Sequence, residues 1–86
     1  MRIDTHKNYD KMWAKLSARQ QVRVLVALKL FTNNQHDASL RVHQLKSKYY
    51  PQYSLSVSGD LRVHYARVSD DRVVLMMVGT HSQLYG

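Results

Sequence analysis

The side chains best able to exchange protons lie near the C-terminus. An apolar run, Val73 to Val78, leads through Gly79 and Thr80 to His81, and Tyr85 follows four residues later. Imidazole titrates near neutral pH, and a separation of four residues places two side chains on one side of a helical turn. This pattern is typical of general acid–base chemistry. It also fits a histidine and a tyrosine that only pack back onto a sheet.

A carboxylate and a guanidinium are expected to meet His81. If residues 70–71 form a two-residue hairpin turn, Arg62 lies opposite Gly79, whose missing side chain leaves room above the arginine. Asp60 precedes the same strand, so Asp60, Arg62 and His81 converge. Arginine binds phosphate bidentately while histidine or aspartate moves protons, which suits phosphodiester cleavage without a metal ion. The structural alternative is a surface salt bridge between Asp60 and Arg62.

A basic and aromatic segment precedes the predicted sheet. Its basic residues are Arg41, His43, Lys46 and Lys48, which lead into Tyr49 and Tyr50. Aromatic rings can stack on bases while lysine holds phosphates, so this segment is a candidate for RNA contact. The alternative is a loop whose charges are only solvated. His64, on the same strand face as Arg62, is a further candidate for RNA contact.

Composition restricts the partners of this 86-residue chain, whose size fits a single domain over residues 1–86. Its formal net charge of +7 predicts a polyanionic partner such as RNA, DNA or an acidic protein. No cysteine is present, which excludes disulfides and fits a reducing cytoplasm. No apolar run approaches the ~18 residues that cross a bilayer, so we expect a cytoplasmic protein without membrane contact.

The sequence lacks the patterns of two other classes of site, namely metal sites and serine-hydrolase sites. The five histidines show no short ligand spacing such as H-x3-H, so no metal or other cofactor is predicted. A serine hydrolase would need a Gly-x-Ser-x-Gly elbow, which the chain lacks.

The first half of the chain predicts two helices. Apolar residues recur at helical spacing between Tyr9 and Leu16, after Asn8, a suitable N-cap. Ser17 and Gln20 match a capping box, and the second helix is expected to end near Asn34. This helix is apolar on most sides, so we expect the sheet and the first helix to cover it.

The second half changes to the alternation typical of strands. Segments 53–57, 61–68 and 73–78 are separated by turn residues and predict an antiparallel meander. Residues 2–5 are expected to add an edge strand. The prediction is an α+β fold of order β-α-α-β-β-β, in which a helical hairpin packs on one face of a small antiparallel sheet. The other face is left for function.

Three motifs resemble a family of bacterial toxins. They are His43-x-Leu45-Lys46, Gly59-Asp60-Leu61-Arg62-Val63-x-Tyr65, and Gly79-Thr80-His81-Ser82-x-Leu84-Tyr85. Together they resemble the RelE/ParE superfamily, nearest the YafQ-like mRNA interferases, and the predicted order of elements is RelE-like. The Gly-Thr-His-Ser tail is the most specific part.

The resemblance implies the toxin of a type II toxin–antitoxin system. Such a toxin enters the ribosomal A site, beside rRNA, and cleaves mRNA by attack of the 2′-hydroxyl without a metal, until a cognate antitoxin blocks it. The toxin–antitoxin complex is expected to bind operator DNA through the antitoxin.

The same resemblance assigns roles to residues. His43, Asp60, His81 and Tyr85 match positions used for catalysis or substrate placement, with His81 and Asp60 sharing the acid and base work. Arg62 matches an arginine that stabilises the scissile phosphate. The basic positions that contact RNA are matched by Lys46 and Lys48.

The chain departs from the YafQ-like pattern at three positions. Ser56 stands where relatives can carry a histidine, Leu61 where they carry an aromatic residue, and Ser47 where glycine is customary. A ParE-like toxin that inhibits a protein such as DNA gyrase is the alternative, and it would not need His81 and Tyr85. A simple nucleic-acid-binding module is a third, and it predicts salt-dependent binding.

Overall fold

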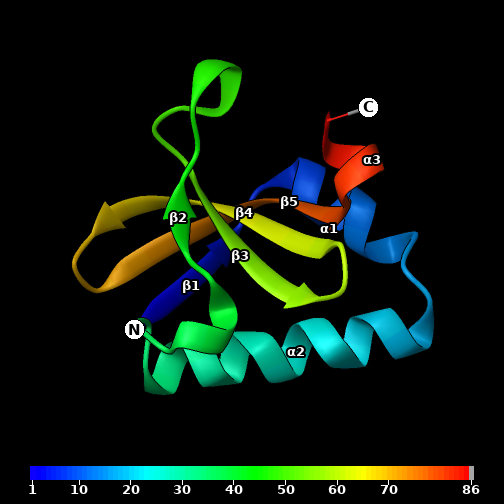
Figure 1. The fold of residues 1–86 in the computed structure, drawn as a ribbon, viewed down its shortest axis with the longest axis horizontal. Coiled ribbons are helices and arrows are strands. Elements are labelled where there is room, and N and C mark those ends of the chain that lie inside the picture. The colour runs from blue at the N-terminus through cyan, green and yellow to red at the C-terminus, as the bar shows by residue number, and fades with distance from the viewer. Residues whose placement is uncertain (86) are drawn as a thin grey trace.

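A five-stranded sheet forms the centre of the molecule, described here from a computed structural model for residues 1–85 (Figure 1). The helices are α1 (Lys7–Ala14), α2 (Ala18–Asn33) and α3 (His81–Tyr85), with 3₁₀ turns η1 (Ala38–Leu40) and η2 (Ser47–Tyr49). The strands are β1 (Arg2–Thr5), β2 (His43–Gln44), β3 (Tyr53–Ser58), β4 (Leu61–Ser69) and β5 (Arg72–Thr80). The predicted α+β class and element order are confirmed, with β2 and α3 added. No helix in the described part is long and apolar enough to cross a membrane.

The sheet is mixed, in the order β1-β5-β4-β3-β2. Strand β1 runs parallel to β5, and the other neighbours are antiparallel. The sequence predicted the edge strand but only antiparallel pairing. Alternation of apolar and polar residues does not show whether a strand runs parallel or antiparallel to a partner that lies far along the chain. The parallel pairing of Ile3 with Val73 could therefore not be predicted from the sequence.

Local signals set the ends of the long helices. The predicted capping box begins α2: Gln20 N donates to Ser17 Oγ at 3.1 Å, and Ser17 N donates to Gln20 Oε1 at 2.9 Å. Asn34 caps its C-terminus, also as predicted. The N-cap of α1 is His6, whose Nδ1 accepts from Asn8 N at 3.0 Å. The predicted cap, Asn8, therefore lies inside α1.

One face of α2 packs on the sheet while the opposite face is open to solvent. The residues buried in the first face are Val24, Ala27 and Phe31. Val22, Leu25 and Val26 are 59%, 56% and 65% exposed, and we call them the α2 stripe. The prediction that the sheet and α1 cover most sides of α2 is wrong, because α2 lies along the outside of the fold with no layer beyond it (Figure 1).

The two faces of the sheet have different contents. The hydrophobic core lies on the face that meets α1 and α2, and its strand residues include Leu55, Val63, Tyr65, Val73 and Leu75. The paired residues on the opposite face of β3 and β4 are Ser54 with His64 and Ser56 with Arg62. We call this second face the polar face.

The register between β4 and β5 places Arg62 opposite Gly79, as predicted. The two-residue turn at 70–71 is also as predicted, but two bulges separate it from this pair. Val68 is extra on β4 and Met76 is extra on β5, so the second bulge removes the offset that the first introduces. The pairing at the polar face therefore agrees with the register predicted from the turn alone.

Candidate active site

A cavity of about 340 Å³, open to solvent, hollows the polar face beside α3. Its lining residues are Arg41, His43, Ser54, Ser56, Arg62, His81 and Tyr85. Two arginines, two histidines and three hydroxyl groups meet here without a carboxylate among them. Cations and hydrogen-bond donors in this combination fit an oxyanion such as a phosphate group. We call this cavity the cationic hollow.

Arg62 is half-buried and anchored from β3. Its Nη1 donates to Ser56 Oγ at 2.7 Å. A guanidinium has five N–H donors in a fixed plane, so this contact leaves others free for a bound anion. Ser56, a departure from the YafQ-like pattern, thus holds the arginine in place. The prediction that Arg62 and His81 share one site is confirmed by their common position in the hollow.

His81 is the first residue of α3, and a second capping box fixes that helix. Thr80 N donates to Gln83 Oε1 at 2.8 Å, and Gln83 N donates to Thr80 Oγ1 at 3.3 Å. A Cβ at Gly79 would lie 2.8 Å from the same Gln83 oxygen. Glycine at position 79 therefore leaves room for the Gln83 side chain that caps α3. Gln83 occupies the space left by the missing side chain of Gly79.

Asp60 joins the site through its main chain. His81 N donates to Asp60 O at 3.0 Å, which ties the β3–β4 turn to α3. The Asp60 side chain is exposed and does not line the hollow, so the predicted convergence holds for Arg62 and His81 but not for this carboxylate. Within residues 1–85 the ion pairs join Asp4 to two arginines, and the alternative Asp60–Arg62 salt bridge is not among them.

The short strand β2 brings His43 to the hollow. His43 pairs with Ser54 in register, and its Nδ1 lies 3.0 Å from Arg41 O. Arg41 has a φ of 46°, a left-handed conformation that turns the chain into β2. The sequence singled out both residues but assigned them to a segment before the sheet. A two-residue strand is too short to show alternation.

Tyr85 belongs to an aromatic cluster that anchors α3. Its ring centroid lies 4.7 Å from that of His81 and 5.6 Å from that of Tyr49. The Tyr49 hydroxyl donates to Leu84 O at 2.6 Å. Burial, and then the nearby Tyr49, raise the pKa of the Tyr85 hydroxyl above its usual value. Tyr85 is therefore protonated at neutral pH and able to donate a hydrogen bond to an anion.

His64 is buried beneath this cluster, so the prediction that it contacts RNA is wrong. The residue is 0% exposed, and its Nε2 lies 3.2 Å from the Tyr85 oxygen. Burial, with smaller effects from His43 and Arg62, lowers its pKa from 6.5 to about 4. The ring is therefore neutral at pH 7. Alternation predicted the face of His64 correctly but could not show that Tyr49 and Tyr85 cover it.

Lys46 and Lys48 are exposed and lie outside the lining of the hollow. Lys48 Nζ is 5.1 Å from the centre of the Tyr49 ring, which links it to the aromatic cluster. Ser47, between them, has a φ of 58°, the left-handed region in which glycine is favoured. The expected glycine at this position therefore has a conformational reason. The contact of both lysines with RNA stays a prediction.

Two lining residues of the hollow were not predicted to be functional, namely Ser54 and Ser56. The two serines lie opposite His64 and Arg62 on the neighbouring strand. Pairing the predicted hairpin would have placed both hydroxyls on the Arg62 face. Tyr49 was predicted as part of a segment for RNA contact, but its hydrogen bond to α3 gives no signal in the sequence, because it joins η2 to a distant part of the chain.

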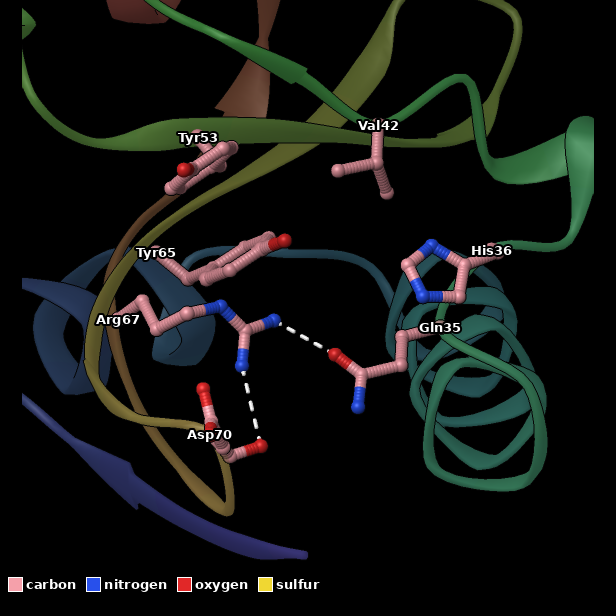
Figure 2. A pocket seen from close by; sticks show the side chains of 7 residues that line it. All are labelled: Gln35, His36, Val42, Tyr53, Tyr65, Arg67 and Asp70. Carbon is pink, nitrogen blue, oxygen red and sulfur yellow. Dashed lines mark hydrogen bonds between the residues drawn. The ribbon is translucent and has the colours of Figure 1, made fainter.

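A second cavity, of about 500 Å³, opens on the core side of the sheet beyond the end of α2 (Figure 2). Its arginine, Arg67, donates from Nη2 to Gln35 Oε1 at 2.6 Å and from Nη1 to the carbonyl oxygens of Ser69 and Asp70 at 3.3 Å each. The guanidinium thus ties the segment after α2 to the β4–β5 turn. Because the protein itself engages this cation, we assign the cavity a structural role.

Comparisons with solved structures agree with the fold described above. No protein-family model and no curated protein sequence matches the chain. A crystal structure of YafQ from E. coli BL21(DE3) superposes with a TM-score of 0.81 at 21% identity, covering 100% of both chains. The YoeB/ParE toxin of Agrobacterium tumefaciens gives 0.73 at 14% identity, covering 94% of this chain and 99% of that one. The chain has the RelE/ParE-like toxin fold.

A third match to the toxin fold comes from a complex. The E. coli DinJ–YafQ toxin–antitoxin complex gives a TM-score of 0.78 at 22% identity, covering 98% of this chain and 96% of that one. The predicted RelE-like fold is thereby confirmed. In this chain, the RelE/ParE-like fold presents the cationic hollow on the sheet face that its two long helices leave uncovered.

Proposed function

We propose that this chain is the toxin of a type II toxin–antitoxin pair and that it cleaves mRNA on the ribosome. The observation that carries the proposal is the grouping of His43, His81 and Tyr85 around Arg62 in the cationic hollow. Two imidazoles can supply a base and an acid, and a guanidinium can stabilise the charge of a phosphate in the transition state. This set suffices for cleavage of an RNA strand next to its 2′-hydroxyl.

The reaction is a displacement at phosphorus. One of His43 and His81 takes the proton of the 2′-hydroxyl as the 2′-oxygen bonds to phosphorus. The other gives a proton to the 5′-oxygen as the bond from phosphorus to that oxygen breaks. The products are a 2′,3′-cyclic phosphate and a 5′-hydroxyl. Arg62 and the Tyr85 hydroxyl bind the non-bridging oxygens, and His43 replaces the expected Asp60 carboxylate, which lies outside the hollow.

The partner that blocks the toxin is an acidic antitoxin, expected in the same cytoplasm. YafQ is known in a toxin–antitoxin complex with DinJ, and YoeB in a complex with YefM. The α2 stripe is exposed, Arg19 and Arg23 lie beside it, and α2 contains no acidic residue. An amphipathic acidic segment would cover this surface and match its charge. Operator DNA would be bound through that antitoxin.

The test is to express the wild-type chain and His81→Ala without antitoxin and to map the 5′ ends of ribosome-bound mRNA. New 5′-hydroxyl ends with the wild type, and their loss in the variant at equal protein level, are expected. Absence of new ends, or equal cutting by the variant, overturns the proposal.

A second candidate is a ParE-like toxin that inhibits a protein such as DNA gyrase. Leu61, which replaces the expected aromatic residue, is buried in the core and offers no ring for stacking on a base. This alternative predicts growth arrest that persists in His81→Ala and leaves mRNA intact. Inhibition of purified gyrase by both proteins would support it.

A further inference from the structure

His64 lies directly behind the cationic hollow. It is 0% exposed, its Nε2 is 3.2 Å from the Tyr85 oxygen, and the Tyr49 ring packs edge-on against it at 4.9 Å between centroids. Tyr85 lines the hollow but His64 does not. His64 therefore does not touch a bound anion, and its hydrogen-bond contact among the lining residues is with Tyr85.

Two buried polar atoms beside this contact have no hydrogen-bond partner among the described residues. They are Nδ1 of His64 and Oγ of Ser54. The two residues are paired directly across β3 and β4, and Ser54 forms part of the wall of the hollow. Unpaired buried polar atoms are costly and rare, so a shared water or a small rotation of the serine is expected to join these two.

A hydrogen bond between these two atoms would decide which nitrogen of His64 carries the proton. If the Ser54 hydroxyl donates toward Nδ1, that nitrogen is unprotonated, and the Nε2–H group donates to the Tyr85 oxygen. The Tyr85 hydrogen then points away from His64. In the other tautomer Tyr85 donates to Nε2 and presents only lone pairs to the hollow, which would repel an anion.

We propose that His64 is a positioning residue: held as the Nε2–H tautomer by Ser54, it fixes the Tyr85 hydroxyl as a donor to a phosphate group in the cationic hollow. The inference rests on the proposed function for its ligand, a phosphate of RNA. It adds a buried residue that never touches the substrate and gives Ser54 a role in setting the tautomer.

The first test reads the tautomer directly. Long-range ¹H–¹⁵N correlation spectra of ¹⁵N-labelled wild-type protein are recorded at pH 7 with and without inorganic phosphate. Nε2 of His64 is expected to be protonated and Nδ1 unprotonated in the phosphate-bound protein. Protonation of Nδ1, alone or together with Nε2, overturns the proposal.

The second test measures phosphate affinity by NMR titration. Tyr85→Phe and His64→Leu are each expected to weaken binding about tenfold, and the double variant no further, because His64 acts on the anion through the Tyr85 hydroxyl. His64→Gln can place an amide N–H near Nε2 and should restore binding to within about threefold of wild type. His36→Leu, outside the hollow, is the control and should bind normally. Full affinity in His64→Leu, or additive losses in the double variant, overturns the proposal.

These readouts separate the inference from the proposed function. Phosphate binding and the tautomer do not require RNA cleavage. Wild-type protein that binds phosphate with Nε2–H but cuts no mRNA would defeat the proposed function and leave the role of His64 intact. Wild-type protein that binds no phosphate would defeat the role of His64. If His64→Leu fails to fold, the spectra of the wild type and of Ser54→Ala still decide, because Ser54→Ala should shift the Nδ1 resonance.

Discussion

The two faces of the sheet bury their residues in different ways. On the core face, Leu55, Val63 and Leu75 pack among other apolar side chains under α1 and α2. On the polar face, Ser54 and His64 are equally buried, and each has a polar atom without a hydrogen-bond partner among residues 1–85. The comparison teaches that the core face supplies stability, while the polar face gives up stability to hold cations and hydroxyls in fixed positions.

The largest effect should separate a residue of the cationic hollow from a residue of the core face. His81→Ala should lower mRNA cleavage by about 100- to 10,000-fold while thermal unfolding stays close to wild type, because a proton-transfer group is lost from a surface hollow. Val63→Ala, on the core face, should lower the free energy of unfolding by about 2 kcal/mol and leave cleavage per folded molecule unchanged. Primer extension measures mRNA cleavage, and circular dichroism measures unfolding. If the two variants changed cleavage and stability in the same way, the two faces of the sheet would not have the separate roles proposed for them.

The polar face should also make stability depend on pH. The pKa of His64 is about 4 in the folded chain and 6.5 as an unperturbed group, so between these values the unfolded chain binds a proton that the folded chain does not. This contribution is fully present above pH 6.5 and lost as pH falls toward 4, by about 3 kcal/mol in total.

Urea unfolding at pH 7 and pH 4.5 measures this loss, with His64→Gln as the control. The variant should show a clearly smaller loss of stability over the same range. Equal losses in the two proteins would show that other groups cause the acid sensitivity.

A smaller effect should follow from crowding the cap of α3. Gly79→Ala places a methyl group against Gln83 and should lower the free energy of unfolding by about 1–2 kcal/mol, together with cleavage, because His81 begins this helix. Ser82→Ala, exposed on the same helix, is the control. Normal cleavage by a folded Gly79→Ala protein would mean that the cap does not position His81.

Relief of backbone strain should act in the opposite direction. Ser47→Gly should raise the free energy of unfolding by about 1 kcal/mol, because Ser47 holds a left-handed φ that costs a side chain this much. Ser82→Gly, in a helix, should instead lower it by about 0.5 kcal/mol. Chemical denaturation distinguishes the signs, and destabilisation by both would contradict the assignment of strain at Ser47.

The smallest change in stability is expected at the α2 stripe. Leu25→Ser should alter the free energy of unfolding by about 0.5 kcal/mol or less, because the side chain is already 56% exposed. It should nevertheless weaken binding of a co-expressed antitoxin. Val68→Ser, similarly exposed on β4, is the matched control. Equal antitoxin binding by Leu25→Ser and wild type would show that an antitoxin does not bind this face of α2.

The sequence predicted those parts of the fold that depend on neighbours in the chain. The capping box of Ser17 and Gln20 follows from a few adjacent residues, and the register of Arg62 with Gly79 follows from the turn because the two bulges cancel. The burial of His64 and the outward direction of the Asp60 side chain depend on contacts with α3 and with the β3–β4 turn. Such contacts arise only when distant segments meet, so spacing along the chain could not supply them.

The paired bulges at Val68 and Met76 limit how this hairpin can change in length. Deleting either residue alone would shift β5 by one position and turn the residues that meet Arg62 to the opposite face. Removing both would restore the pairing at the polar face. Single-residue insertions and deletions here should therefore preserve the pairing of Arg62 with Gly79 only in matched pairs, and a chain that loses one bulge must lose the other to keep this pairing.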